Sequence, residues 1–171
     1  MWYVIQVYTG RELEIAQQCR DRVTEDGEDV FVPLAERWTK IHGERTLITS
    51  RLFPGYVFIE TEKIEDFHER LKRIYAMTKV LRIGEDMIPI QKEEEEYLRR
   101  LCGEEHVVKY SEGYLEGDKL VVTSGPLKDF AGKVKKVLRH KRLVVMEVPL
   151  LGRTVEVTLG MGVLERRQKS L

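Results

Sequence analysis

A change of pattern near residue 115 constrains the fold of this chain more than any other sequence feature. Before it, strand-like runs alternate with helical repeats. After it, short β-branched runs follow one another, separated by glycine turns. Residues 1–114 carry 17 basic and 23 acidic side chains, a net charge of −6, whereas residues 115–171 carry 12 basic and 6 acidic, a net charge of +6. A charge split of this kind indicates two modules, of which the basic one faces a polyanion.

The first module is predicted to have an α+β fold. Its order of strands and helices is β-α-β-β-β-α-β-α, which fits an antiparallel or mixed sheet covered by helices. The strands are expected near residues 2–8, 30–32, 46–48, 56–59, 80–83 and 87–90, with a hairpin turn at His42-Gly43. The run at residues 2–8 is apolar on both faces and therefore predicts a central strand.

The first helix is predicted to start at a capping box, Thr9-Gly10-Arg11-Glu12, in which the Glu12 carboxylate reaches back to the helix start. The expected buried stripe of this helix follows at helical spacing and consists of Leu13, Ala16, Cys19 and Val23. Two further helices are predicted over residues 64–74 and from residue 91.

Residues 1–103 are therefore expected to form one domain and residues 115–171 another. Between them, residues 104–114 have no clear period and are interpreted as a linker. The last module contains five short strands in about 55 residues, a pattern that predicts a small β-barrel.

Several motifs, in order along the whole chain, resemble the NusG family of transcription elongation factors. These are Trp2-Tyr3-Val4, the run from Arg51 to Phe58 (RLFPGYVF), Gly117-Asp118, Gly125-Pro126-Leu127, Phe130, Gly132, Val134 and Leu151-Gly152-Arg153. Each motif alone is common, but together and in this order they are specific. The resemblance implies an antiparallel sheet flanked by helices (the NusG N-terminal, or NGN, domain), followed by a five-stranded SH3-like barrel (the KOW domain).

The resemblance also implies that the N-terminal domain packs an apolar depression onto the clamp helices of RNA polymerase. Phe53 stands beside Pro54, which donates no ladder hydrogen bond, and Gly55, which has no side chain to cover its neighbour. A ring exposed there would contribute about 1.5–3 kcal/mol when buried against a helix. The expected polymerase-binding residues are Phe53, Tyr56 and Tyr8. The alternative for each ring is a place in the core of the sheet.

The most distinctive local feature is a basic stretch from Lys133 to Arg142, with six Lys or Arg side chains in ten residues. Such a patch favours RNA through contacts with phosphates, and a basic KOW domain resembles the LoaP branch of specialised paralogues, which an RNA hairpin recruits. The alternative is a solvated surface that discourages edge aggregation. The expected RNA-binding residues are Lys128, Lys133, Lys135, Lys136, Arg139, His140, Lys141, Arg142 and Arg153.

Two other functions stay open. In a housekeeping NusG the KOW domain would bind a ribosomal protein or the termination helicase, and in a ribosome-associated protein the barrel would bind rRNA. Contact with the non-template DNA strand is expected only on polymerase, because the N-terminal half is acidic. The candidate residues for that contact are Arg11, Lys40, Arg45, Arg70, Arg73 and Lys79.

The sequence does not favour catalysis or a bound metal. The four histidines and two cysteines have no metal-ligand spacing, and no nucleophile elbow or phosphate loop is present. We therefore expect a protein without enzymatic activity, cofactor or metal. No run reaches the roughly 18–20 apolar residues of a membrane span, and two cysteines are too few for a disulfide framework. A cytoplasmic monomer is expected.

Overall fold

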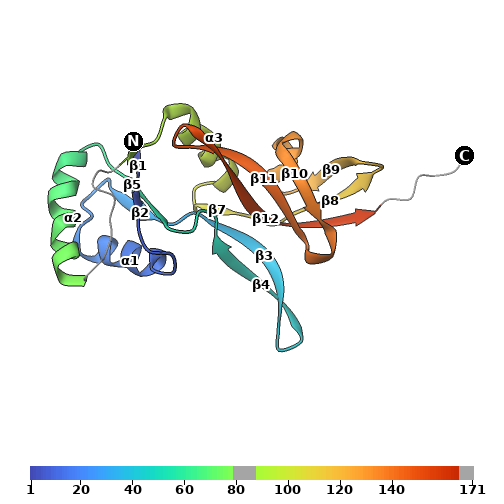
Figure 1. Cartoon of the computed structure of the whole chain (residues 1–171), viewed down its shortest axis with the longest axis horizontal. Coiled ribbons are helices and arrows are strands. Elements are labelled where there is room, and N and C mark those ends of the chain that lie inside the picture. The colour runs from blue at the N-terminus through green and yellow to red at the C-terminus, as the bar shows by residue number, and fades with distance from the viewer. Residues whose placement is uncertain (79–87, 166–171) are drawn as a thin grey trace, which may run out of the picture. The chain divides into compact units, whose positions relative to one another are not determined.

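The computed structural model describes residues 1–78 and 88–165, and helices and β-sheets make up the fold (Figure 1). This confirms the predicted α+β class. The chain divides into two compact units. The first consists of Met1–Pro33 and Phe53–Glu96, and the second of Leu34–Leu52 and Tyr97–Leu171. Each unit is described by itself.

The first unit is built on a four-stranded antiparallel sheet in the order β2-β5-β1-β6. Its strands are β1 (Trp2–Gln6), β2 (Asp29–Phe31), β5 (Tyr56–Glu60) and β6 (Ile88–Pro89). Because β1 pairs with a strand on both sides, its place inside the sheet is as predicted. The strand expected at residues 80–83 lies outside the described residues.

The helices are α1 (Glu12–Arg22), α2 (Ile64–Thr78) and α3 (Lys92–Cys102), and α1 packs against β2, β5 and α2 (Figure 1). The expected buried stripe of α1 is wrong at its first residue, because Leu13 is 54% exposed. The buried face instead begins with Glu12 and continues through Ile15, Ala16 and Cys19. Glu12 lies one helical turn before Ala16, and it therefore takes the inward position.

The second unit contains a long hairpin of β3 (Leu34–Ile41) and β4 (Glu44–Arg51), paired along its whole length. His42 and Gly43 form the turn with φ angles of 52° and 80°. Positive φ at both central residues is the conformation that matches the twist of a two-residue hairpin. The predicted hairpin turn is confirmed.

The rest of the second unit is mainly a five-stranded sheet in the order β10-β11-β12-β8-β9. Its strands are β8 (Ser111–Glu116), β9 (Lys119–Ser124), β10 (Val134–Leu138), β11 (Leu143–Leu150) and β12 (Arg153–Glu165). Three short helical turns accompany them, η1 (Pro126–Asp129), η2 (Ala131–Lys133) and η3 (Arg139–Lys141). The number of strands is as predicted, and every second residue of β11 is buried.

Two expectations for this region are wrong. The expected linker, residues 104–114, contains β7 (Val107–Val108), which pairs with β3, and the first part of β8. Strand β7 pairs with distant residues of β3, and β8 pairs with distant residues of β12 as well as with the adjacent β9. The two short strands expected near residues 154–157 and 163–165 are one strand, β12, which is antiparallel to β11 and then parallel to β8.

Strand β3 lies against β12 at a glycine. A Cβ atom on Gly160 would stand 2.1 Å from the carbonyl oxygen of Glu36 and 2.8 Å from the Cα of Arg37, closer than real Cβ contacts. The Glu36 carboxylate accepts a hydrogen bond of 2.9 Å from the backbone N–H of Tyr110. The Leu34 N–H donates to the carbonyl of His106 at 2.9 Å. The hairpin is thus part of the second unit, and separate folding of residues 1–103 and 115–171 stays a prediction.

A partly buried ion pair joins α2 to the loop before β2 in the first unit. Arg70 donates to both carboxylate oxygens of Glu28, at 2.8 and 3.0 Å, and the Thr61 hydroxyl donates to the same carboxylate at 2.6 Å. Burial acts to raise the pKa of Glu28, but the hydrogen bonds from Arg70, Thr61 and the Glu25 N–H together lower it below its ordinary value. The charged form is therefore favoured in the folded state.

Replacing Glu28 with glutamine should lower the free energy of unfolding at pH 7 by about 1–3 kcal/mol, since charged hydrogen bonds are lost. Because the folded-state pKa of Glu28 lies below the unfolded value, the stabilisation is present above about pH 4.3 and is lost as the pH falls through the folded-state value. Urea unfolding at pH 7 and pH 3 checks this. The variant Glu25→Gln, whose carboxylate is 68% exposed, is the control. A Glu28→Gln deficit of equal size at both pH values would contradict the prediction.

Candidate functional site

The ring of Phe53 does not lie at the surface. Phe53 is 2% exposed, and its ring stacks on Phe58 with centroids 5.7 Å apart and planes at 27°. Phe58 in turn contacts the rings of Phe31 and Trp2, at 5.5 and 6.1 Å. The Tyr56 N–H donates to the Phe53 carbonyl at 3.1 Å, a tight turn that brings Phe53 back over β5. The expectation of an exposed ring at position 53 is therefore wrong.

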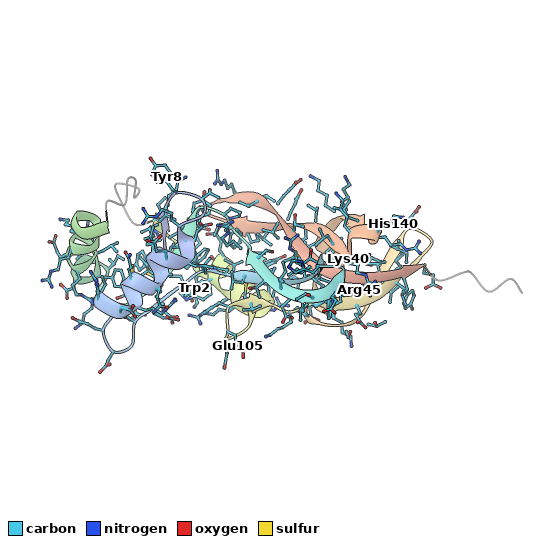
Figure 2. The ribbon with its side chains drawn as sticks, turned by 90° about the horizontal axis from the view of Figure 1, so that it is seen from below. Trp2, Tyr8, Lys40, Arg45, Glu105 and His140 are labelled. Carbon is cyan, nitrogen blue, oxygen red and sulfur yellow. The ribbon has the colours of Figure 1, made fainter. Side chains whose placement is uncertain are left out.

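The other two aromatic candidates are more accessible. Tyr8 is 47% exposed and projects from the ribbon (Figure 2), and Tyr56 is half-buried. Gln6 pairs directly with Tyr56 across β1 and β5. Gln6, the last residue of β1, and Tyr8, in the loop that follows it, are both exposed. Leu13, in the first turn of α1, is also exposed. We call Tyr8, Leu13 and Tyr56 the apolar surface of the first unit.

A buried carboxylate holds the backbone beneath this surface. Glu12 is fully buried, and its two oxygens accept hydrogen bonds from the backbone N–H groups of Gly10 and Gly55. The N–H of Val7 donates to the Gly55 carbonyl at 2.8 Å.

The capping box expected from Thr9 is wrong, because the helix begins at Glu12 with Arg11 as its N-cap, and no side chain of the described residues caps it. Its one correct part is that the Glu12 carboxylate reaches back, to the Gly10 N–H. The motif could not show the bond to Gly55, which lies 43 residues away.

Replacing Glu12 with alanine should destabilise the protein by about 1–3 kcal/mol, because two buried N–H groups lose their acceptor. Thermal unfolding measures this loss. The matched control is Glu14→Ala on the same helix, where the side chain is 54% exposed and pairs with Arg11 on the surface. Equal melting temperatures for the two variants would show that Glu12 does not hold the loops together.

Within the basic stretch, Lys135 differs from the other candidates because it forms ion pairs with two carboxylates. Lys135 Nζ lies 2.7 Å from Glu156 and 3.1 Å from Glu147, and hydrogen bonds to these two carboxylates raise its pKa. Its charge is therefore compensated within β10, β11 and β12. Lys135 is nevertheless 55% exposed. The other exposed candidates are Lys128, Lys133, Lys136, Arg139, His140, Lys141 and Arg153, whereas Arg142 is half-buried.

Residues Arg139–Arg142 form the turn between β10 and β11, which we call the tip. Arg142 adopts a left-handed conformation with a φ of 55°, which ends η3. Burial raises the pKa of the Tyr110 phenol, and the nearby positive charge of Arg142 partly opposes this rise. One end of the tip thus lies close to Tyr110, in the segment between β7 and β8.

The tip and the β3–β4 hairpin line two cavities of the second unit. One, of about 480 Å³, is lined by residues that include Arg45, Tyr110 and Arg142. The other, of about 360 Å³, is lined by residues that include Trp38, Lys40 and Lys141. Arg45, His140 and Arg142 line both. We call the two cavities together the groove, and Figure 2 shows Lys40 and Arg45 near His140.

The candidates for DNA contact therefore fall into different places. Lys40 and Arg45 line the groove with residues expected to bind RNA, which the sequence did not predict. Arg70 is paired with Glu28, so its charge is compensated within the fold, and its contact with DNA stays a prediction. Arg11 forms an ion pair of 2.9 Å with Glu14. Arg73 is exposed, and Lys79 lies outside the described residues.

The thiols have the environment of core residues. Cys19 and Cys102 are buried and free, and burial raises the pKa of each thiol to about 12. Within residues 1–78 and 88–165, no group of three His, Cys, Asp or Glu side chains is placed to hold a metal ion. The described helices also include none that is long and apolar enough to cross a membrane.

Comparison with known proteins identifies the family. A family model described as "Transcription termination factor nusG" matches residues 1–99, more than half of the chain. The chain is 30% identical over 172 residues to the transcription termination/antitermination protein NusG of Haemophilus influenzae, covering 96% of this chain and 93% of that protein. The chain belongs to the NusG family. NusG of Pasteurella multocida is 26% identical, with 96% and 94% coverage.

NusG relatives are transcription factors, and the general function of this chain therefore lies in transcription, in termination and antitermination. Among solved structures, a chain described as "Crystal Structure of MjSpt4:Spt5 complex conformation A" is 19% identical and covers 94% of this chain and 93% of its own length. Its TM-score of 0.34 is too low to support an argument about the arrangement of the chain.

Proposed function

We propose that this chain is a transcription elongation and antitermination factor that binds RNA polymerase through its first unit and RNA through its second. Membership of the NusG family supports a role on the transcription machinery. The observation that carries the RNA half of the proposal is the tip, where a short turn presents Arg139, His140 and Lys141 to solvent. The proposed factor has no enzymatic activity, and it acts in the cytoplasm, where transcription takes place.

The apolar surface of the first unit is the proposed contact with the polymerase clamp helices. Tyr8 and Leu13 are about half exposed. Covering this apolar area with a partner helix would stabilise the complex, because the area would be removed from water. Tyr8 also carries a hydroxyl at the end of an apolar ring, a combination that is enriched at protein interfaces. Phe53 supports this surface from the core, and we assign it a positioning role.

Replacing Tyr8 with alanine should weaken binding to RNA polymerase by about tenfold or more, as expected for an aromatic residue at the centre of an interface. Pull-down with core polymerase measures binding, and transcription through a terminator, with and without an upstream RNA leader, measures the consequence. The control is Ile88→Ala, which removes a similarly exposed apolar side chain from β6. Phe53→Ala is less informative, since it creates a cavity in the core.

Unchanged binding by Tyr8→Ala would contradict the proposed surface. Retention of ribosomal subunits in place of polymerase would favour the ribosome-associated alternative. If polymerase binds but the RNA leader has no effect, a housekeeping factor with a protein partner for its KOW domain becomes the better interpretation.

The electrostatic argument for RNA rests on which lysines are free to release counterions. A cation that binds a phosphate displaces condensed counterions, so each contact adds to the salt dependence of binding. Lys135, Lys136 and Lys141 are all exposed, but Lys135 already forms ion pairs with two carboxylates of the fold. Neighbouring lysines of the same stretch are therefore expected to differ in their effect on RNA.

Replacing Lys136 and Lys141 together with glutamine should reduce RNA affinity, and the slope of log K against log salt should fall by about 0.7 for each phosphate that is no longer neutralised. Lys135→Gln, which removes a neutralised charge from the same strand, should change the slope much less. Fluorescence anisotropy with the full chain at about 50–200 mM salt measures both. Equal effects of Lys135→Gln and the double variant would contradict a specific role for Lys136 and Lys141.

A further inference from the structure

The groove brings together two segments that lie almost a hundred residues apart. Arg45 from β4 and His140 and Arg142 from the tip line both of its cavities. Their combination depends on the position of the hairpin in the second unit, where the backbone of Glu36 and Arg37 lies against Gly160. The groove is thus a feature of the folded unit and belongs to neither segment alone.

Positive charge dominates the lining of the groove. Six Lys or Arg side chains line one or both cavities, namely Arg37, Lys40, Arg45, Arg139, Lys141 and Arg142, and Glu112 is the acidic residue of the lining. A concave, cationic surface raises the positive electrostatic potential that a polyanion meets there. An anionic chain is therefore the ligand that its charge fits.

Aromatic rings accompany these charges. Trp38 lines one cavity and Tyr110 the other, and the two rings meet edge to face with centroids 6.3 Å apart and planes at 88°. Both are half-buried, and Tyr114 adds a third half-buried ring. The Nε of Arg37 is buried without a hydrogen-bond partner among the described residues. A ligand with flat rings and hydrogen-bond acceptors would use both features.

We propose that the groove is a binding site for single-stranded RNA, in which unpaired bases stack at Trp38 and Tyr110 while Lys40, Arg45 and Arg142 bind phosphates. This inference rests on the proposed RNA-binding function and adds the hairpin to its site (Figure 2). Stacking on aromatic side chains within a basic groove is the usual mode of single-strand recognition.

A single strand fits the groove better than a duplex. A-form RNA keeps its bases stacked inside the helix and offers proteins chiefly phosphates and 2′-hydroxyls, so rings placed in a concave site would remain unused. Unpaired bases of a loop or a free strand can be turned outward into cavities of about 480 and 360 Å³. The hollow shape and the rings together therefore favour unpaired nucleotides.

The first test is a charge change on the hairpin in the full chain. Lys40→Gln with Arg45→Gln should weaken binding of a mixed-sequence RNA of about 12 nucleotides at least about fivefold and lower the salt slope by about 1.4, for two phosphates on a single strand. The matched control, Lys63→Gln with Lys92→Gln, removes the same charge from exposed lysines of the first unit. The same RNA annealed to its complement should bind more weakly than the single strand.

Tryptophan fluorescence gives a readout of stacking. The chain has two tryptophans, of which Trp2 is 1% exposed in the core and Trp38 is half-buried in the groove. Saturating single-stranded RNA should quench the emission, and the variant Trp38→Phe should lose that quenching while it keeps an aromatic ring. Quenching that persists in Trp38→Phe would overturn the proposed stacking.

A third variant changes the position of the hairpin without changing any charge. Gly160→Val would force β3 away from β12, because a side chain there meets the Glu36 carbonyl, and RNA affinity should fall as in the hairpin charge variant. Gly132→Ala, at a glycine with open space around it, is the control. If Gly160→Val fails to fold by circular dichroism, the charge variants still test the proposal.

The outcomes separate this inference from the function on which it rests. Loss of single-strand binding in the hairpin variants, but not in their controls, supports both. RNA binding that depends on Lys136 and Lys141 but not on Lys40 and Arg45 overturns the groove and leaves the proposed function standing. Equal affinity for the duplex also overturns the groove. No RNA binding by the wild-type chain removes both.

Discussion

The close approach of β3 to β12 at Gly160 determines the composition of the second unit. Only a residue without a side chain permits the carbonyl of Glu36 to come to the distance found. Gly162, two residues later on the same strand, leaves similar room beside the Tyr110 hydroxyl. Because both glycines face the same side of β12, they admit the backbone of the hairpin and the ring of Tyr110 next to each other. The groove depends on this packing.

The hairpin changes the electrostatics of the basic module. Residues 34–52 contribute four basic and two acidic side chains, so the second unit is more positive than residues 115–171 alone. At the same time, Glu147 and Glu156 neutralise Lys135 in the middle of the basic stretch. The tip and the hairpin therefore add positive charge outside β10. Counting charges along the sequence indicated a basic module, but it could not show this contribution of the hairpin.

The sequence predicted the elements whose signals are local. The turn at His42-Gly43, the internal strand β1 and the alternation of β11 each follow from a few adjacent residues. The errors concern pairings over long distances. Residues 104–114 look like a linker because β7 pairs with β3 and the start of β8 pairs in part with β12, and both of these partners lie far away in the sequence. Gly160 and Gly162 lie between the two strands expected near residues 154–157 and 163–165, in the part of β12 that approaches β3 and Tyr110.

The aromatic candidates illustrate the same limit for the site. The sequence places Phe53 beside a proline and a glycine, and this predicts an interrupted strand but not the side of the sheet that the ring takes. The turn returns Phe53 to Phe58, and the ring joins a core cluster. The exposed ring is instead that of Tyr8. Tyr8 lies on the loop before Glu12, and the Glu12 carboxylate accepts a hydrogen bond from the Gly55 N–H. A buried carboxylate must be satisfied by fixed donors, and it therefore restrains both loops and lowers the conformational entropy that Tyr8 would lose on binding.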